Sequence, residues 1–121
     1  MGDDDGLLGT WRIDHVDGEP VGDDPSRSRP ELTFEADGQL YGSGGVNRLR
    51  GTWTRHDDVL DVGPVAMTMM AGTPEHMAHE QAVLRVLASA PLLRLDADAL
   101  TLDGAGTTLT LTRDHPTPAA G

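Results

Sequence analysis

The amino-acid sequence predicts a mainly β domain of the α+β class, in which one antiparallel sheet wraps around a shared interior and one helix packs against it. Three observations support this prediction. Short runs with apolar residues at every second position recur along the chain, separated by turn residues, as in half-buried antiparallel strands. A single segment has helical periodicity. The 121 residues suffice for one hydrophobic core.

The first strand is predicted in residues 10–14, where Trp11 and Ile13 share one face and the polar residues share the other. Residues 17–29 are rich in Asp, Pro, Ser and Gly, so we expect a long, mobile loop there.

The clearest hairpin follows this loop. Residues 31–36 alternate in the same way, and residues 39–41 form the return strand. Between them, Asp37 and Gly38 predict a two-residue turn, because both residue types tolerate a positive φ.

The remaining strands are expected at residues 49–55 and 59–62, and then in three closely spaced runs near the C-terminus. Those three runs are marked by the leucine pairs Leu93/Leu95, Leu100/Leu102 and Leu109/Leu111. Their short connections predict a meander.

The helix is expected from Pro74 to about Ala90. Thr73 suits its N-cap, Pro74 its first position and Glu75 the positive end of its dipole, and Pro91 ends it. Its apolar stripe is predicted to comprise Met77, Leu84 and Leu87, with Val83 beside it.

Charge and composition exclude several function classes. The formal net charge is −11, which disfavours nonspecific binding to nucleic acids. All basic residues are arginine, and Arg48, Arg50 and Arg55 cluster around Trp53. We interpret that cluster as an ordinary exposed strand face, with anion recognition as the alternative. Cysteine is absent, which excludes disulfides and thiol nucleophiles.

Residues 1–6 are interpreted as a disordered acidic N-terminus, residues 7–113 as the domain and residues 114–121 as a flexible tail. No apolar stretch is long enough to cross a bilayer, and the first residues lack the features of a secretory signal. The sequence as written therefore predicts a cytoplasmic protein, or an exported one if a leader preceded it.

The order of local patterns resembles the META domain, the family of the heat-shock-associated protein HslJ. The resemblance spans residues 7–113 and rests on residues 8–11, 32–34, 42–47, 51–53, 65–71, 100–102 and 109–111. It implies a barrel, partly open and similar to lipocalins, and a bacterial protein linked to stress or to the cell envelope, but no particular reaction. The residues that it singles out as structural or binding residues are Trp11, Gly44, Gly45, Asn47, Arg48, Gly51, Trp53, Thr68, Met70 and Glu80.

The chain departs from this family at two positions. Members commonly carry cysteines where Val46 and Gly72 stand here. Because both are replaced together, we expect the two residues to lie close in space.

Two candidate metal sites have simpler explanations. His76, His79 and Glu80 have a spacing that could place two ligands together, but no third ligand is evident, so we favour a polar outer helix face. The methionines around residue 70 are expected to fill gaps in the core rather than to bind copper.

The segment around Ser43 is rich in glycine but leads into a strand, so it fits neither a phosphate-binding loop nor a nucleophile elbow. We expect a sharp corner in the sheet, tied by Asn47 to the loop backbone.

These observations favour a non-enzymatic binding or accessory module without a cofactor or metal, as a monomer or weak dimer. Its partner would be a small apolar ligand in the barrel or a protein on an exposed edge strand, although we expect a packed interior. The alternatives are a hydrolase that uses Ser43, Asn47 and a helix histidine, and a weak metal-binding protein with His76 and His79 as ligands.

Overall fold

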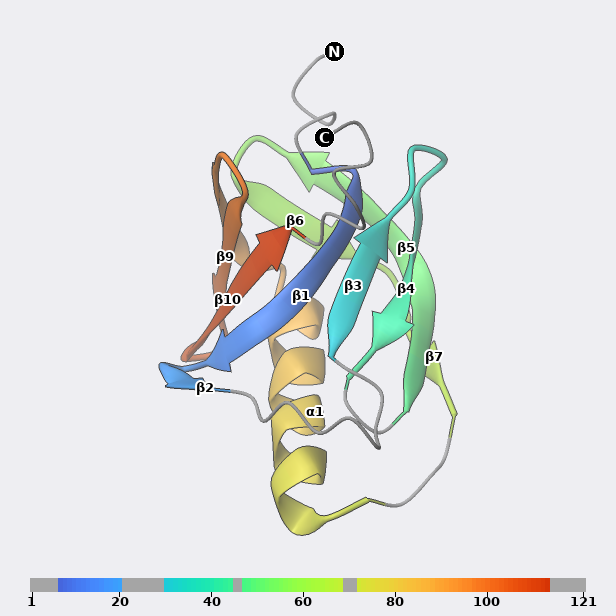
Figure 1. The fold of residues 1–121 in the computed structure, drawn as a ribbon. Coiled ribbons are helices and arrows are strands. Elements are labelled where there is room, and N and C mark those ends of the chain that lie inside the picture. Colours follow the sequence, from blue (N-terminus) through green and yellow to red (C-terminus); the bar gives the residue numbers. More distant parts are fainter. Residues whose placement is uncertain (1–6, 21–29, 45–46, 69–71, 114–121) are drawn as a thin grey trace, which may run out of the picture.

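The computed structural model describes residues 7–20, 30–44, 47–68 and 72–113, and eight of its strands form a closed antiparallel barrel (Figure 1). The predicted α+β class is confirmed, and the barrel is closed rather than partly open. The elements are β1 (Gly9–Val16), β2 (Glu19–Pro20), β3 (Glu31–Phe34), β4 (Gln39–Ser43), β5 (Arg48–His56), β6 (Val59–Val62), β7 (Ala66–Met67), α1 (Pro74–Ala88), β8 (Leu92–Asp96), β9 (Ala99–Gly104) and β10 (Thr107–Arg113).

The barrel closes where the first strand meets the last. From β1 the order of neighbours runs through β3, β4, β5, β6, β8 and β9 to β10, which pairs with β1. That closing ladder extends from Trp11 opposite Arg113 to Val16 opposite Leu109, with a register shift between Ile13 and His15. The short strands β2 and β7 extend the sheet beside β1 and β5. The predicted C-terminal meander is confirmed as β8, β9 and β10.

The inward positions of the strands fill the interior of the barrel. Phe34 and Trp53 meet edge to face, with ring centroids 5.4 Å apart. The strand residues of the core, each at most 5% exposed, are Trp11, Ile13, Leu32, Phe34, Leu40, Leu49, Trp53, Leu60, Leu93, Leu100, Leu102, Leu109 and Leu111. Their two-residue spacing is the pattern from which the sheet was predicted.

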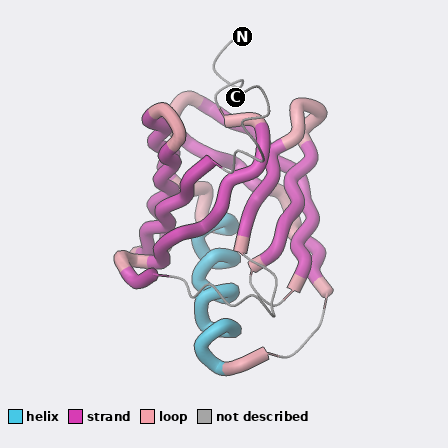
Figure 2. Tube along the Cα trace, in the orientation of Figure 1, coloured by secondary structure: helices cyan, strands magenta, loops and turns pink. Residues whose placement is uncertain are grey.

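Helix α1 contacts β1, β6, β9 and β10, and Figure 2 shows it at the lower end of the barrel. It begins at Pro74 as predicted. The predicted stripe is partly wrong, because Met77 and Leu84 are only half-buried. The buried residues are Glu80, Ala82, Val83, Val86 and Leu87. At 3.6 residues per turn these form one face, and Met77 and Leu84 lie at its edge.

The turn between β3 and β4 differs from the predicted two-residue turn. Residues 35–38 connect the strands, Gly38 N donates to the Glu35 carbonyl at 3.0 Å, and Gly38 has a φ of +93°. The longer turn allows Trp53 to bond both ends of it: its Nε1 donates to the Glu35 carbonyl, and its main-chain N donates to the Gly38 carbonyl, each at 3.0 Å.

The predicted loop at residues 17–29 is also partly wrong. Asp17 and Gly18, with φ values of 55° and 88°, form a tight turn into β2, which returns along β1. Both residues adopt the positive φ that a two-residue hairpin favours. The rest of that loop lies outside the described residues, as do the predicted N-terminal segment 1–6 and the tail 114–121.

The two leucines Leu102 and Leu92 give a matched test of the packed interior. Leu102 is completely buried and Leu92 is 59% exposed. We expect Leu102→Ala to lower the free energy of unfolding by about 2–5 kcal/mol, because it leaves a cavity. Leu92→Ala should change it by less than about 0.5 kcal/mol. Urea denaturation followed by tryptophan fluorescence measures both, and equal losses would contradict a packed interior.

Candidate functional site

A buried polar cluster joins the corner between β4 and β5 to helix α1. Glu80 is 1% exposed and Asn47 2% exposed. The Asn47 main-chain N donates to Glu80 Oε1 at 2.6 Å, and its side-chain Nδ2 donates to Glu80 Oε2 at 2.7 Å. The carboxylate, which burial alone would disfavour, is thereby held by two short hydrogen bonds from one residue.

Thr68 adds a third segment of the chain to this cluster. Its hydroxyl donates to Asn47 Oδ1 at 3.0 Å and accepts from the main-chain N of Arg48 at 3.1 Å. The corner, the chain after β7 and the helix are therefore connected through one carboxamide. We call Asn47, Thr68 and Glu80 the corner cluster.

Gly44 provides the space that Glu80 occupies. A Cβ at Gly44 would lie 2.6 Å from Glu80 Cγ. The Gly44 main-chain N donates to the Asn47 carbonyl at 3.0 Å. Because Glu80 is buried, it has no free direction in which to move away. A larger residue at position 44 would therefore displace the helix or the corner.

The residues of the corner cluster were grouped together in the sequence analysis only as part of the family pattern, and the structure shows that hydrogen bonds link them. The prediction that Glu80 lies on a polar outer helix face is wrong, since it belongs to the buried face. The Asn47 carboxamide bonds Glu80 and Thr68, and the expected bond from Asn47 to the loop backbone stays a prediction. Gly45 and Met70 lie outside the described residues, as does Val46, so its predicted closeness to Gly72 stays a prediction.

The other residues of that pattern shape the barrel. Trp11 Nε1 donates to the Leu7 carbonyl at 2.9 Å, and the guanidinium carbon of Arg113 lies 4.3 Å from the Trp11 ring centroid. A Cβ at Gly51 would lie 3.1 Å from the Pro64 carbonyl oxygen, so glycine permits this chain crossing. Trp11, Gly51 and Trp53 are therefore structural.

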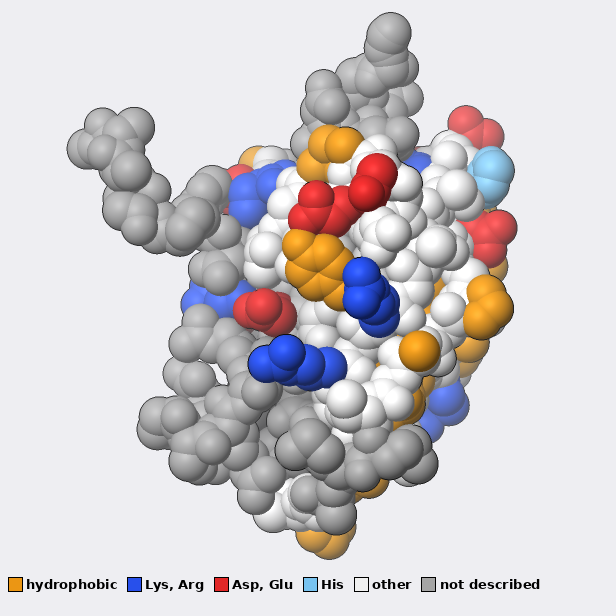
Figure 3. Space-filling model, turned by 90° about the vertical axis from the view of Figure 1, so that its right-hand side faces the viewer, with side chains coloured by type: hydrophobic (Ala, Val, Ile, Leu, Met, Phe, Trp, Pro, Cys, Tyr) orange, Lys and Arg blue, Asp and Glu red, His pale blue; other side chains and the backbone are white. Residues whose placement is uncertain are grey.

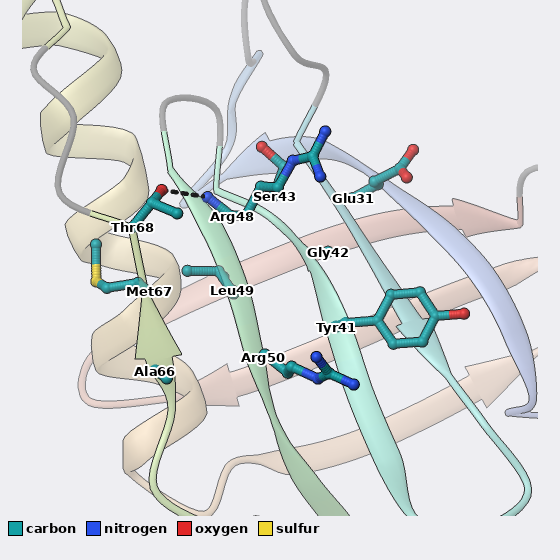
Figure 4. A pocket seen from close by; sticks show the side chains of 10 residues that line it. All are labelled: Glu31, Tyr41, Gly42, Ser43, Arg48, Leu49, Arg50, Ala66, Met67 and Thr68. Atoms are coloured by element: carbon teal, nitrogen blue, oxygen red, sulfur yellow. Dashed lines mark hydrogen bonds between the residues drawn. The ribbon is translucent and has the colours of Figure 1, made fainter.

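A solvent-facing depression of about 810 Å³ lies on the outside of β3, β4, β5 and β7, and we call it the outer groove (Figure 4). Figure 3 looks onto this face and shows basic and acidic side chains around a small apolar patch. The lining residues are Glu31, Tyr41, Gly42, Ser43, Arg48, Leu49, Arg50, Ala66, Met67 and Thr68.

Sheet register aligns the polar side chains of the groove in two rows. Glu31, Ser43 and Arg48 are successive cross-strand partners, and Tyr41 is the partner of Arg50. Figure 4 shows Arg48 extending over Ser43 toward Glu31, and Arg50 beside the Tyr41 ring. Cross-strand partners share a face of the sheet, so the side chains of both arginines lie on the same surface.

The two groove arginines are exposed and form no ion pair with any residue in the described ranges. A third arginine, Arg12, is the cross-strand partner of Glu31 on β1. Its Nε is buried and has no hydrogen-bond partner among the described residues. Basic and acidic side chains thus alternate on this face, because Glu31 lies between the arginines and Glu35 and Asp37 lie near Tyr41.

Tyr41 is the aromatic residue of the groove and is 40% exposed. Its hydroxyl donates to Glu35 Oε2 at 2.5 Å. This hydrogen bond, together with some burial and the nearby charges of Glu35 and Asp37, raises the pKa of Tyr41 above 10.0. The phenol therefore remains protonated and fixed in place at neutral pH.

The hydrolase candidates lie in different places. Ser43 ends β4 and is buried, and the residues that line the groove beside it include no histidine. His79 lines a separate pocket with Val16 and Thr107, and its Nδ1 is buried without a hydrogen-bond partner in the described part of the chain. His76 carries a side chain that the structure does not describe.

Two properties of the described residues bear on other functions. No group of three or more His, Asp or Glu side chains among them lies close enough to hold a metal ion. No helix among the described residues is both long enough and apolar enough to cross a membrane.

The sequence pointed to Arg48 and Arg50 but not to the groove. It grouped them with Arg55 and Trp53, whereas Trp53 faces the interior and the Arg55 Nε bonds the Asp57 carbonyl at 2.9 Å. Strand alternation already placed Arg48 and Arg50 on one face. Tyr41 and Glu31 were missed because only the sheet register brings them there.

Comparisons with known proteins identify relatives of the whole chain. A family model described as META domain matches residues 5–116. A protein solved by NMR is 28% identical, with a TM-score of 0.75, over 88% of this chain and 91% of its own. No protein with a curated description matches.

Two further structures share the fold. A protein from Burkholderia xenovorans, solved by NMR, is 23% identical with a TM-score of 0.71 over 94% of this chain and 88% of its own. A DUF4847 family protein from Bacteroides vulgatus, solved by crystallography, is 19% identical with a TM-score of 0.61 over 90% of this chain and 94% of its own.

Asn47→Ala tests the corner cluster. It removes one hydrogen bond to a buried carboxylate, so we expect the free energy of unfolding to fall by about 1.5–3 kcal/mol. Glu80→Gln should also destabilise, because its amide would face the Asn47 amide. Combining Asn47→Asp with Glu80→Gln restores a donor–acceptor pair and should recover part of the loss. Denaturant unfolding measures these variants and Asn47→Asp alone, and strictly additive losses in the double variant would contradict the direct bond.

Tyr41 gives a spectroscopic test, because it is the single tyrosine of the chain. We expect phenolate absorbance in the folded protein to titrate with a midpoint above 10.0. Glu35→Gln should lower that midpoint, since it removes the carboxylate that accepts the bond. The stabilisation linked to this bond is present below pH 10.0 and is lost as the pH rises through the raised pKa. A midpoint unaffected by Glu35→Gln would contradict the assignment.

Proposed function

Because this chain belongs to the META domain family, whose model matches residues 5–116, we propose that it is a non-enzymatic binding module and that the outer groove is its binding surface. The observation that carries this proposal is the pair Arg48 and Arg50. Both guanidinium groups border a groove of about 810 Å³ and form no ion pair with the described residues. A volume of this order is typical of ligand sites.

The packed interior of the barrel favours its outer face as the binding surface. Its centre is occupied by leucines and aromatic side chains that are almost completely buried, and small barrels of this kind hold at most a small ligand. Closure also pairs the long strands on both sides. Within the described residues, the sheet ends in β2 and β7, which are two residues each, so strand addition is a weaker proposal than groove binding.

A hydrolase that uses Ser43 remains the alternative activity. It needs a base within hydrogen-bond reach of the serine, directly or through one water. Among the described residues, those that line the groove include no histidine, which favours binding over hydrolysis. We also propose a monomer or weak dimer. An accessory role in stress or the cell envelope is proposed from the family resemblance alone.

A ligand screen followed by NMR tests the binding surface. The probes are neutral, cationic and anionic fragments together with palmitate. We expect bound fragments to shift the backbone amide signals of Tyr41, Arg48 and Arg50, because these residues line the groove. Signals from Leu102 and Leu111, at the centre of the barrel, should stay unchanged.

Two outcomes would contradict this proposal. Palmitate binding with shifts at Leu102 and Leu111 would place the site inside the barrel. Turnover of an ester substrate that Ser43→Ala abolishes, while the fold is retained, would make the protein a hydrolase.

A further inference from the structure

We propose that the outer groove binds an extended acidic peptide segment that carries carboxylates at alternate positions. This proposal rests on the binding surface proposed above and adds the chemistry of the ligand. It is carried by three features of the groove: its charge, the spacing of its arginines and the aromatic side chain beside them.

The charged residues that line the groove have a small positive excess, opposite in sign to the net charge of the protein. Two arginines and one glutamate line it, whereas the whole chain has a net charge of −11. An anionic segment is therefore repelled by most of the surface, including Glu35 and Asp37 near Tyr41, and attracted to Arg48 and Arg50, which favours one orientation on approach. Because the two guanidinium groups lack carboxylate partners among the described residues, a ligand need not displace an existing ion pair.

The spacing of the arginines matches that of an extended chain. Arg48 and Arg50 are two residues apart on β5 and face the same side. The rise of a strand separates such positions by about 6.6–6.8 Å. Carboxylates at alternate positions of an extended peptide have the same separation, so one peptide lying along β5 can offer one carboxylate to each guanidinium. Arginine binds carboxylates through two parallel hydrogen bonds, which adds geometric selectivity.

The other lining residues suit the remainder of a peptide. The Tyr41 ring lies beside Arg50 (Figure 4), and its hydroxyl is held by Glu35. A fixed aromatic side chain gives apolar contact at a low cost in conformational entropy. Ala66 and Met67 of β7 form the opposite border. Glu31 repels acidic ligands at the end of the groove where Arg48 lies, so it lowers the affinity of the groove for them.

A long polyanion such as a nucleic acid fits this face less well. It would extend beyond two arginines onto a surface of the same charge sign, and nucleic-acid affinity depends on neutralising many phosphates. The geometry therefore favours a short peptide segment of a partner protein.

The experiment uses the full chain and three peptides. The first is acetyl-Thr-Asp-Val-Asp-Thr-amide, the second has the same composition with its two aspartates adjacent, and the third carries Asn in place of both Asp residues. We expect the first peptide to shift the amide signals of Tyr41, Arg48 and Arg50 in NMR titrations. The second should bind more weakly, because adjacent residues of an extended chain face opposite sides, and the third weakest.

Variants of the charged lining residues test the proposal, because removing an arginine and removing the glutamate should have opposite effects on binding. Arg48→Gln and Arg50→Gln should each weaken binding of the first peptide about tenfold, since each removes a charge-assisted hydrogen-bond pair. Glu31→Gln should strengthen it. The matched control is Arg94→Gln, an exposed arginine on β8 that lines a different depression, and it should leave the affinity unchanged.

The results separate this inference from the proposed binding surface. Equal binding of all three peptides, or an affinity unaffected by Arg48→Gln and Arg50→Gln, would overturn the carboxylate assignment. If neutral fragments shift the groove signals while the acidic peptide does not, the surface stands and the ligand chemistry is wrong. If no probe of any charge shifts those signals, the proposed function fails as well. Tighter binding of a single-stranded oligonucleotide than of the peptide would favour a nucleic-acid ligand instead.

Discussion

Pairing of β1 with β10 is the constraint on which the rest of the structure depends. It joins the two ends of the domain and turns an open sheet into a barrel. Closure provides backbone partners for both strands and encloses the leucines that would otherwise face water. Arg113 strengthens this seam, because its guanidinium covers the Trp11 ring and donates from Nη1 to the Leu8 carbonyl at 2.7 Å.

The barrel fixes the corner cluster, and the cluster fixes the edge of the outer groove. Asn47 holds Glu80 of the helix and accepts from Thr68, whose hydroxyl in turn binds the main chain at Arg48. The Arg48 main chain is therefore linked through the exposed Thr68 to the buried Asn47 and Glu80, while the Arg48 side chain faces solvent. Such a rigid support reduces the entropy that an arginine at this edge loses on binding.

The buried architecture and the outer groove are formed by largely different residues, although Arg48 and Thr68 of the family pattern are exposed and line the groove. Residues that the family pattern singles out, such as Trp11, Gly44, Asn47 and Glu80, are buried and hold the architecture together. The groove residues Tyr41 and Arg50 are exposed and contribute little to the core. A barrel can therefore keep its interior while the chemistry of its outer face changes, which is why membership of a fold family does not by itself identify a ligand.

The sequence by itself determined the eight strands of the barrel, the start of the helix and most of the core, because alternation and capping are local signals, but it missed the short strands β2 and β7. Tertiary structure decided the rest. The Asp37-Gly38 prediction implied a two-residue turn, which pairs Tyr41 with Phe34, whereas the longer turn pairs it with Thr33 and so places Tyr41 on the outer face. Glu80 looked like a surface residue because its partner Asn47 lies 33 positions away in the sequence. Both outcomes depend on contacts between distant segments, and no local pattern of residues encodes them.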